Sequence, residues 1–378
     1  MEGTTESARS DGALAPVVGQ ERKGALDTLR GVALLGILLM NIVAMGLPFS
    51  YGDPTVSGGA EGLDLAAWVM NNLFFEGTMR GLFSLMFGAG VVLLTSRAEE
   101  RGGGIEVADI YLRRNLWLFA FGIVHGWLLL WYGEILYFYG IAGLFLFAFR
   151  KLPPRTLIIL GALVLVSLVP KNIYEYVTTN SAWDEAQAAQ IVQENLAEGE
   201  ELSEEQQGAV DTWKGIEEDA NPSAEKIEER IEGMRGNYFT IIGTISGPLI
   251  WFQSSGLYEF MFFDTVGMML IGMAFLKLGI ITGERSNRLY LLLMLLCYGI
   301  GLGINVYETR LIVNNGFDIF AYQQASLTYG VGRVAVTFGH IGFWMLICKN
   351  GWLKWLTNRL AAVGRMALTN YCLLYTSD

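Results

Sequence analysis

Two histidines occur in this chain of 378 residues, and both lie in strongly apolar segments. His125 belongs to the run Phe121–Leu136 and precedes Glu134 by nine positions. An unperturbed imidazole has a pKa of about 6.5 and can therefore take a proton from a sugar hydroxyl or an amine near neutral pH. A carboxylate can orient such a ring, although a spacing of nine across a turn does not establish contact. We predict His125 and Glu134 as catalytic candidates; the alternative is a neutral histidine that is hydrogen-bonded to a backbone carbonyl.

Charged residues flank the apolar segments and form a second set of candidates. Asp27 and Arg30 lie three apart directly before the first long apolar run, so a helix would place both on one face. At the bilayer surface they could pair with each other or contact a ligand. Arg113 and Arg114 stand in the same way before a later apolar run. Their positions are equally explained by membrane topology.

A polar stripe interrupts another apolar segment. Arg333, Thr337 and His340 are spaced i, i+4 and i+7, which places them on one helix face. An arginine inside a span must meet an anion, a carbonyl group or water, so this face should line a substrate path or meet a structural partner. The candidate structural partners are Glu134, Glu259 and Asp264. Glu76 and Arg80, four apart, are predicted to form a plain ion pair.

Several classes of site are not supported by the sequence. Cys297, Cys348 and Cys372 lie in apolar segments without metal-ligand spacing, so we expect neither a metal site nor a disulfide framework. No glycine-rich loop joins a strand to a helix, and we therefore expect no nucleotide-binding fold. The formal net charge of −11 gives no support to nucleic-acid binding.

The composition indicates an all-α, polytopic transmembrane bundle. Hydrophobic residues make up 52% of the chain and charged residues 17%, and the apolar residues occur in long blocks. About 20 helical residues cross a hydrocarbon core of about 30 Å. Eight spans are predicted, near residues 31–50, 77–96, 115–133, 134–149, 156–176, 260–281, 289–306 and 324–347, and a ninth begins near residue 360. The lipid bilayer is therefore the expected partner.

Basic residues predict the orientation of the bundle. They gather at alternate ends of these spans, around residues 22–30, 97–114, 150–155, 277–288 and 349–359. The positive-inside rule assigns all of these segments, and the amino terminus, to the cytoplasm.

Charge and composition also divide the chain. Residues 1–20 are polar and predicted to be a disordered cytoplasmic tail, and residues 21–176 hold five spans. Residues 177–235 contain sixteen acidic and four basic residues and are predicted to be a solvated helical hairpin on the outer face, or else an acidic funnel for cationic substrates. Residues 236–371 form the C-terminal membrane part, within which 236–258 is favoured as a broken, interfacial or re-entrant segment over a crossing one.

Five motifs resemble the YeiB-like family of bacterial membrane proteins, whose shared domain is domain of unknown function number 418. They are Leu26–Ile42, Phe83–Gly90, the hairpin His125–Glu134, Gly267–Met273 and Val363–Tyr371. The resemblance implies a multi-pass protein of the bacterial cytoplasmic membrane. The family pattern more often has aspartate where this chain has Glu134, and it continues with further spans. Residues 372–378 are similar to a translated sequencing adapter, so we expect a truncated chain with an artefactual tail.

The first motif is also similar to that of membrane-bound acyltransferases, which include heparan-α-glucosaminide N-acetyltransferase. This resemblance implies transfer of an acyl group from cytoplasmic acetyl-CoA or another acyl-CoA to a cell-envelope glycan or small metabolite, with no permanently bound cofactor. In that scheme Asp27, Arg30, Arg113 and Arg114 lie at the site of the CoA phosphates, which the arginines would hold, and His125 activates the acceptor. The alternatives are a secondary transporter with Arg333, Thr337 and His340 along its path, and a non-catalytic scaffold. The oligomeric state is left open.

Overall fold

The chain folds as helices throughout the part described by its computed structural model, residues 24–196 and 200–374, in which no strand occurs. The all-α prediction is therefore confirmed. The predicted tail at residues 1–20 and the last four residues of the predicted 372–378 tail lie outside the described residues.

Within the described residues, six helical segments are long and apolar enough to cross a membrane. They are Gly24–Gly46, Gly62–Glu100, Pro154–Glu194, Tyr238–Lys277, Asn287–Asn314 and Ile319–Asn350. Each contains one of the predicted spans or most of it. The two remaining predicted spans, 115–133 and 134–149, correspond to a helix with charged first turns, α5 (Glu106–Trp127), and to a short apolar helix, α6 (Leu136–Leu146), extended by the 3₁₀ turn η3 (Phe147–Phe149).

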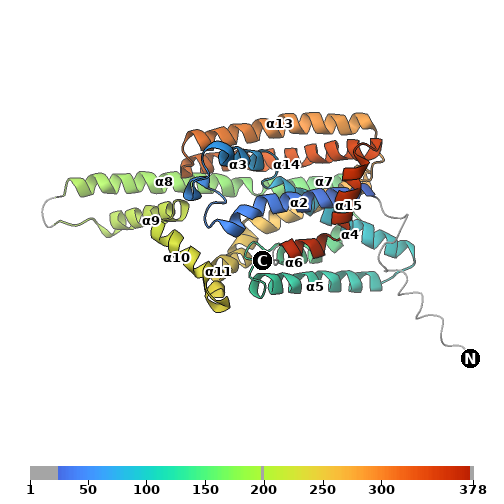
Figure 1. Cartoon of the computed structure of the whole chain (residues 1–378), viewed down its shortest axis with the longest axis horizontal. Helices are drawn as coiled ribbons and strands as arrows, with labels where there is room; N and C mark the ends of the chain where they lie inside the picture. The colour runs from blue at the N-terminus through green and yellow to red at the C-terminus, as the bar shows by residue number, and fades with distance from the viewer. Residues whose placement is uncertain (1–23, 197–199, 375–378) are drawn as a thin grey trace, which may run out of the picture.

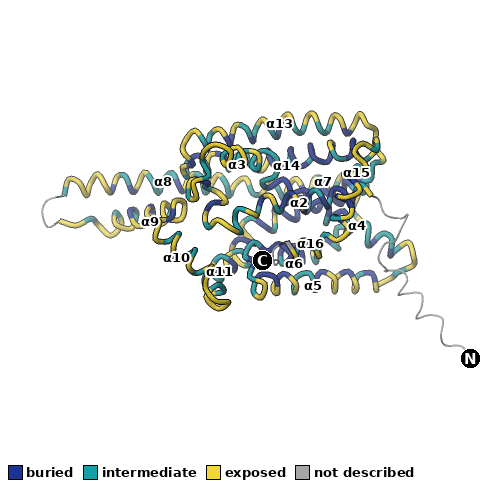
Figure 2. The backbone as a smooth tube through the Cα atoms, viewed as in Figure 1, coloured by how far each residue is buried: buried dark blue, intermediate teal, exposed yellow. Residues whose placement is uncertain are grey.

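The long helices lie side by side along one direction (Figure 1). The centre is formed by α2 (Gly24–Gly46), α4 (Thr78–Glu100) and α12 (Phe262–Lys277). One flank carries α13 (Asn287–Asn314) and α14 (Ile319–Asn350), the other carries α5 and α6, and α7 (Pro154–Val166) packs on α12. Buried positions concentrate in the central helices (Figure 2).

Glycines let the central helices touch at their backbones. A Cβ atom at Gly88 of α4 would lie 1.9 Å from the carbonyl oxygen of Met269, and one at Gly272 of α12 would lie 1.9 Å from that of Leu85. Such close contacts are typical of membrane helices with small residues at their crossing. They fix α4 against α12 and thereby set the frame of the bundle.

The two ends of the bundle differ in charge. We call the end of the bundle at which α2 begins the basic end. Basic residues of the turns at this end include Arg101, Arg150, Lys277 and Lys349. There the amphipathic helix α15 (Lys354–Arg365) crosses α2, and α16 (Ala367–Leu374) turns back beside the bundle. In place of one span beginning near residue 360, the chain therefore forms two short helices that break at Met366.

The opposite end, called the acidic end, carries the predicted insert. The helix α8 (Val169–Glu194) extends beyond the bundle and pairs with α9 (Glu204–Ala220), which α10 (Ala224–Arg235) follows (Figure 1). Ser203 and Ser223 cap α9 and α10 by accepting hydrogen bonds from backbone amides. Rings of Trp183, Trp213 and Phe320 cluster where the insert meets α14.

Two of the membrane-length segments are interrupted at this end. The helix α11 (Tyr238–Gln253) contains Pro248, stops at Ser254 and reaches α12 through a π-helical turn, η4 (Leu257–Met261). The segment 236–258 is thus broken. The helix α3 (Gly62–Phe74) has no buried residue and meets α4 at Gly77, whose φ of 63° is left-handed.

Candidate functional site

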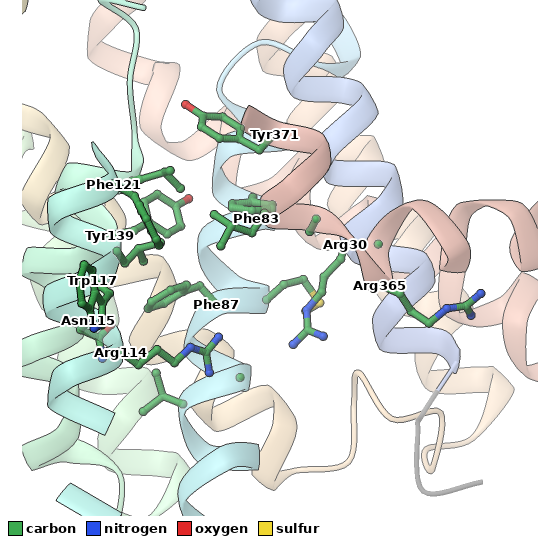
Figure 3. A pocket seen from close by; sticks show the side chains of 18 of the residues that line it. Arg30, Phe83, Phe87, Arg114, Asn115, Trp117, Phe121, Tyr139, Arg365 and Tyr371 are labelled. Atoms are coloured by element: carbon green, nitrogen blue, oxygen red, sulfur yellow. The ribbon is translucent and has the colours of Figure 1, made fainter. Parts of the chain in front are cut away.

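A cavity with a volume of about 720 Å³ lies between α2, α4, α5, α6, α15 and α16. Its walls are mainly aromatic and aliphatic, with a few polar groups. The residues that matter below are Arg30, Phe87, Arg114, Asn115, Phe121, Tyr139, Arg365 and Tyr371 (Figure 3).

Two arginines face this cavity from opposite walls near the basic end. Figure 3 shows the side chains of Arg30 and Arg114 directed toward each other from α2 and α5, whereas Arg365 points away. A guanidinium nitrogen of Arg30 lies 3.3 Å from Oδ1 of Asp27, so the predicted Asp27–Arg30 pair is present. The site therefore offers two guanidinium groups to one anionic ligand.

Arg113 does not belong to this site. Its side chain is 69% exposed and pairs with Asp109 one turn earlier on α5. Successive helical residues point about 100° apart, so Arg113 and Arg114 leave α5 in different directions. Of these two arginines, Arg114 is the one that lines the cavity.

One face of α5 leads from the basic end to the predicted catalytic histidine. Tyr111, Asn115, Leu118, Gly122 and His125 follow one another at spacings of four and three residues, and the first three line the cavity. The Tyr111 hydroxyl donates to the carbonyl oxygen of Gly143 at 2.7 Å, which joins this face to α6. His125 therefore continues the cavity-lining face beyond its inner end.

His125 and Glu134 form a buried pair. Nδ1 of His125 lies 3.4 Å from Oε1 of Glu134, and the two residues are 1% and 2% exposed. The Glu134 carboxylate also accepts hydrogen bonds from the backbone amides of Leu136 at 2.6 Å and Tyr137 at 2.8 Å, at the start of α6. These amides fix the carboxylate, which in turn can hold a proton on Nδ1 and leave Nε2 as the basic nitrogen.

Tyr371 connects this pair to the cavity. Its ring lines the cavity and lies 5.5 Å from the His125 ring, measured between centroids. Its hydroxyl oxygen accepts a hydrogen bond from the backbone amide of Ile135 at 3.1 Å. The His125–Glu134 pair is thus one side chain away from the inner end of the cavity.

The segment 128–135, which contains Glu134, lies next to α11. The Tyr238 hydroxyl of α11 donates to the carbonyl oxygen of Leu128 at 3.0 Å, and Nε1 of Trp127 donates to Oε1 of Gln253 at 3.0 Å. Leu130 within the segment has a φ of 63°, which is uncommon for a residue other than glycine. These hydrogen bonds attach the segment and the end of α5 to α11.

A buried ion cluster occupies the other flank of α4. Asp264, 0% exposed, lies 3.3 Å from Nε of Arg80 and also pairs with Arg333. Of the three predicted partners of Arg333, Asp264 is the one that the structure places beside it. The predicted ion pair between Glu76 and Arg80 was wrong, because Arg80 turns to Asp264 and Glu76 accepts a hydrogen bond from the Tyr51 hydroxyl at 3.2 Å.

The predicted stripe on α14 does lie on one helix face. Most of its side chains are hydrogen-bonded to neighbouring segments of the protein. Thr337 donates to the carbonyl oxygen of Thr78 at 3.1 Å. His340 contacts the carbonyl oxygen of Phe74 through Nε2 at 2.8 Å and the Tyr298 hydroxyl through Nδ1 at 2.7 Å. Arg333 lines a second, smaller cavity. Thr337 and His340 thus join α14 to its neighbours.

Sequence reasoning missed Tyr139 and Tyr371 as parts of the site. The Tyr139 hydroxyl lies 2.6 Å from Oγ of Ser84 and lines the cavity from α6. For Tyr371 a signal existed, because it ends the fifth family motif, whereas no local pattern marks Tyr139.

Comparison with known proteins identifies relatives along nearly the whole chain. Residues 275–375 match the family described as "Protein of unknown function (DUF418)". "Uncharacterized protein YeiB" of Escherichia coli (strain K12) is 30% identical, with 93% of this chain and 81% of that protein covered. "Uncharacterized protein YxaH" of Bacillus subtilis (strain 168) is 28% identical, with 95% and 81% covered. A search of solved structures found no match.

Proposed function

This chain belongs to the YeiB-like DUF418 family of membrane proteins, and we propose that it is a membrane-embedded acyltransferase. It would move an acyl group from acyl-CoA to a hydroxyl or amine of a cell-envelope glycan or small metabolite. The observation that carries the proposal is the single cavity that has Arg30 and Arg114 near one end and Tyr371, in ring contact with His125, at the other.

The arginines suit the phosphate groups of the donor. Guanidinium groups bind phosphate oxygens by charge-assisted, paired hydrogen bonds, and Arg30 and Arg114 approach the cavity from opposite helices. The aromatic walls beyond them, including Phe87 and Phe121, suit the apolar remainder of an acyl thioester. Donor binding at this end requires it to face the cytoplasm, in agreement with the positive-inside rule and a cytoplasmic amino terminus. In this arrangement α5 and α6 complete the eight spans.

The histidine pair suits activation of the acceptor. Nε2 of His125 would take the proton of the acceptor hydroxyl or amine while the acceptor atom attacks the thioester carbonyl carbon. The carbon–sulfur bond then breaks, and the imidazolium returns the proton to the departing thiolate. The products are the acylated acceptor and free CoA thiol, while Glu134 holds the ring through Nδ1.

The proposal is tested by acetyl-CoA turnover of the purified protein in detergent, with water or glucosamine as the acceptor. His125→Ala should lower the rate by about 100-fold or more, because it removes the general base. His340→Gln is the matched control and should retain the rate, because His340 binds Tyr298 and Phe74 outside the cavity. Equal rates for the wild type and His125→Ala would exclude His125 from the mechanism.

Neighbouring arginines provide a test of the donor site. Arg114→Gln should weaken CoA binding by about 10-fold or more, the value of one hydrogen bond to a charged group, whereas Arg113→Gln should leave it unchanged. Equal losses would indicate nonspecific attraction to the basic end. Titration calorimetry with CoA measures both.

Transport of a small solute is the second candidate, and the place of Arg333 in the wall of the second cavity favours it. The protein in proteoliposomes would then move solute without any dependence on CoA. The hydrogen bonds of Thr337 and His340 to backbone carbonyls weigh against a path along that face.

A further inference from the structure

A second cavity of about 250 Å³ opens near the acidic end, between α3, α13, α14, the loop at Tyr51 and the turn at Glu76. It is separate from the cavity that holds Arg30 and Arg114. Its polar lining includes two carboxylates, Glu76 and Glu308, and three tyrosines, Tyr51, Tyr322 and Tyr329. Arg333 lines one side.

Glu308 is a buried acid without a cation of its own. It is 7% exposed, and its Oε1 accepts a hydrogen bond from the Thr328 hydroxyl at 2.6 Å. No basic side chain in residues 24–196 and 200–374 lies within ion-pairing distance of it. Burying a carboxylate in this way is costly unless a positive charge or further donors reach it.

The acidic side chains around the second cavity outnumber the basic ones by one. Asp264 is shared by Arg80 and Arg333, so these three groups carry one net positive charge. Glu76 lies four residues before Arg80, in the turn between α3 and α4, and Glu308 adds a second carboxylate. With all three acids ionised, three acids against two bases leave a formal charge of −1, which a single monovalent cation would neutralise.

The lining also suits an organic cation. Tyrosine rings and hydroxyls attract ammonium groups, and the amide of Asn72 adds a polar group beside the carboxylates. The insert at the same end carries sixteen acidic and four basic residues, which raises the local concentration of cations. The volume accommodates a small molecule of a few heavy atoms.

We propose that this second cavity binds a small organic monocation with a primary ammonium group, held between Glu76 and Glu308. The ammonium group supplies the positive charge that the buried Glu308 lacks, and the tyrosines enclose the carbon chain. This site does not depend on acyl transfer at the larger cavity.

The test is titration calorimetry of the full chain in detergent, with ethanolamine as the probe and ethylene glycol as its uncharged counterpart. Ethanolamine should bind and ethylene glycol should not. Glu308→Gln and Glu76→Gln should each weaken binding by about 10-fold or more, since each removes a charged hydrogen-bond acceptor. Glu229→Gln, on the exposed surface of α10, is the matched control and should bind as the wild type does.

Several results would overturn the proposal. Equal binding of the two probes to the wild-type protein would show that charge has no role, and this comparison needs no variant to fold. Unchanged ethanolamine binding by Glu308→Gln, with an unchanged melting temperature, would show that the buried acid is neutral in the protein. Binding of calcium or sodium ions without binding of ethanolamine would identify an inorganic cation site instead.

Discussion

At the scale of single residues, the environment of an ion pair decides how much it contributes to stability. Asp264 is fully buried between Arg80 and Arg333, whereas Asp109 pairs with Arg113 on the surface of α5. Removing one partner of a buried pair leaves an uncompensated charge and costs about 3–5 kcal/mol, while exposed pairs contribute about 0–1 kcal/mol. The two aspartates therefore form a matched comparison.

Asp264→Asn should destabilise the protein by about 3–5 kcal/mol, because the guanidinium groups of Arg80 and Arg333 then lose their common carboxylate partner. Asp109→Asn should change the free energy of unfolding by less than about 1 kcal/mol. Thermal unfolding in detergent measures both variants under the same conditions. Equal melting temperatures would show that water reaches the cluster around Asp264.

Glu134 combines two roles that substitutions can separate. Its carboxylate accepts from two backbone amides at the start of α6 and also contacts His125. Glu134→Ala should lose about 1–2 kcal/mol of stability through the missing cap, and Glu134→Gln should lose less. Under the proposed mechanism both should lower acetyl-CoA turnover, and Glu134→Asp should restore most of it. A Glu134→Gln variant with full turnover would limit this residue to capping.

Some contacts within a helix could be predicted from the sequence, although Glu76 and Arg80 do not form the expected pair, and contacts between distant segments could not be predicted. The pair Asp27–Arg30 follows from a spacing of three, whereas the spacing of nine between His125 and Glu134 did not establish the contact that the structure shows. The choice of Arg114 over Arg113 depends on how α5 is rotated, which no local pattern fixes. Tyr371 reaches His125 from a helix that lies more than two hundred residues later in the chain.

At the scale of helices, a backbone contact sets the position of the arginine site. A Cβ atom at Gly364 of α15 would lie 1.9 Å from the carbonyl oxygen of Asp27, and one at Gly31 of α2 would lie 2.0 Å from that of Leu360. Both contacts leave no room for a methyl group. Because Arg30 lies on α2 at this crossing, any separation of the helices also moves the donor site.

Gly364→Ala should therefore lower the melting temperature and weaken CoA binding together. Gly299→Ala in α13 is the matched control, since a Cβ atom there meets no atom within 4 Å and the helix gains up to about 1 kcal/mol in propensity. Melting curves and CoA titrations on both variants measure the effect. Full CoA affinity in Gly364→Ala would show that the crossing can relax without moving Arg30.

The sequence was enough to predict that the central helices exist. Where a helix ends and which way it runs depend on packing. The apolar blocks gave the central helices, because length and hydropathy alone define a membrane segment. The chain near residue 360 instead forms α15 and α16, since α15 has one polar face and lies across the end of the bundle. Glycines and Pro248 led us to expect a break in the segment 236–258, but α11 continues through them and ends at Ser254.

For the whole molecule, charge separates the two ends of the bundle. Basic residues gather at the end where α2 begins, and the insert with its sixteen acidic residues extends from the other. The positive-inside rule counts arginine and lysine in short loops, so it assigns the basic end to the cytoplasm. The proposed acyl transfer depends on this orientation, because acyl-CoA is made in the cytoplasm.

Labelling of single cysteines in spheroplasts tests this orientation directly. In a variant with alanine at positions 297, 348 and 372, Glu229→Cys on the exposed face of α10 should react with a membrane-impermeant maleimide in intact spheroplasts. Lys151→Cys, at a side chain that is 70% exposed at the basic end, should react only after lysis. The opposite pattern would invert the bundle and place Arg30 and Arg114 on the side without acyl-CoA, which would remove the basis for acyl transfer from a cytoplasmic donor.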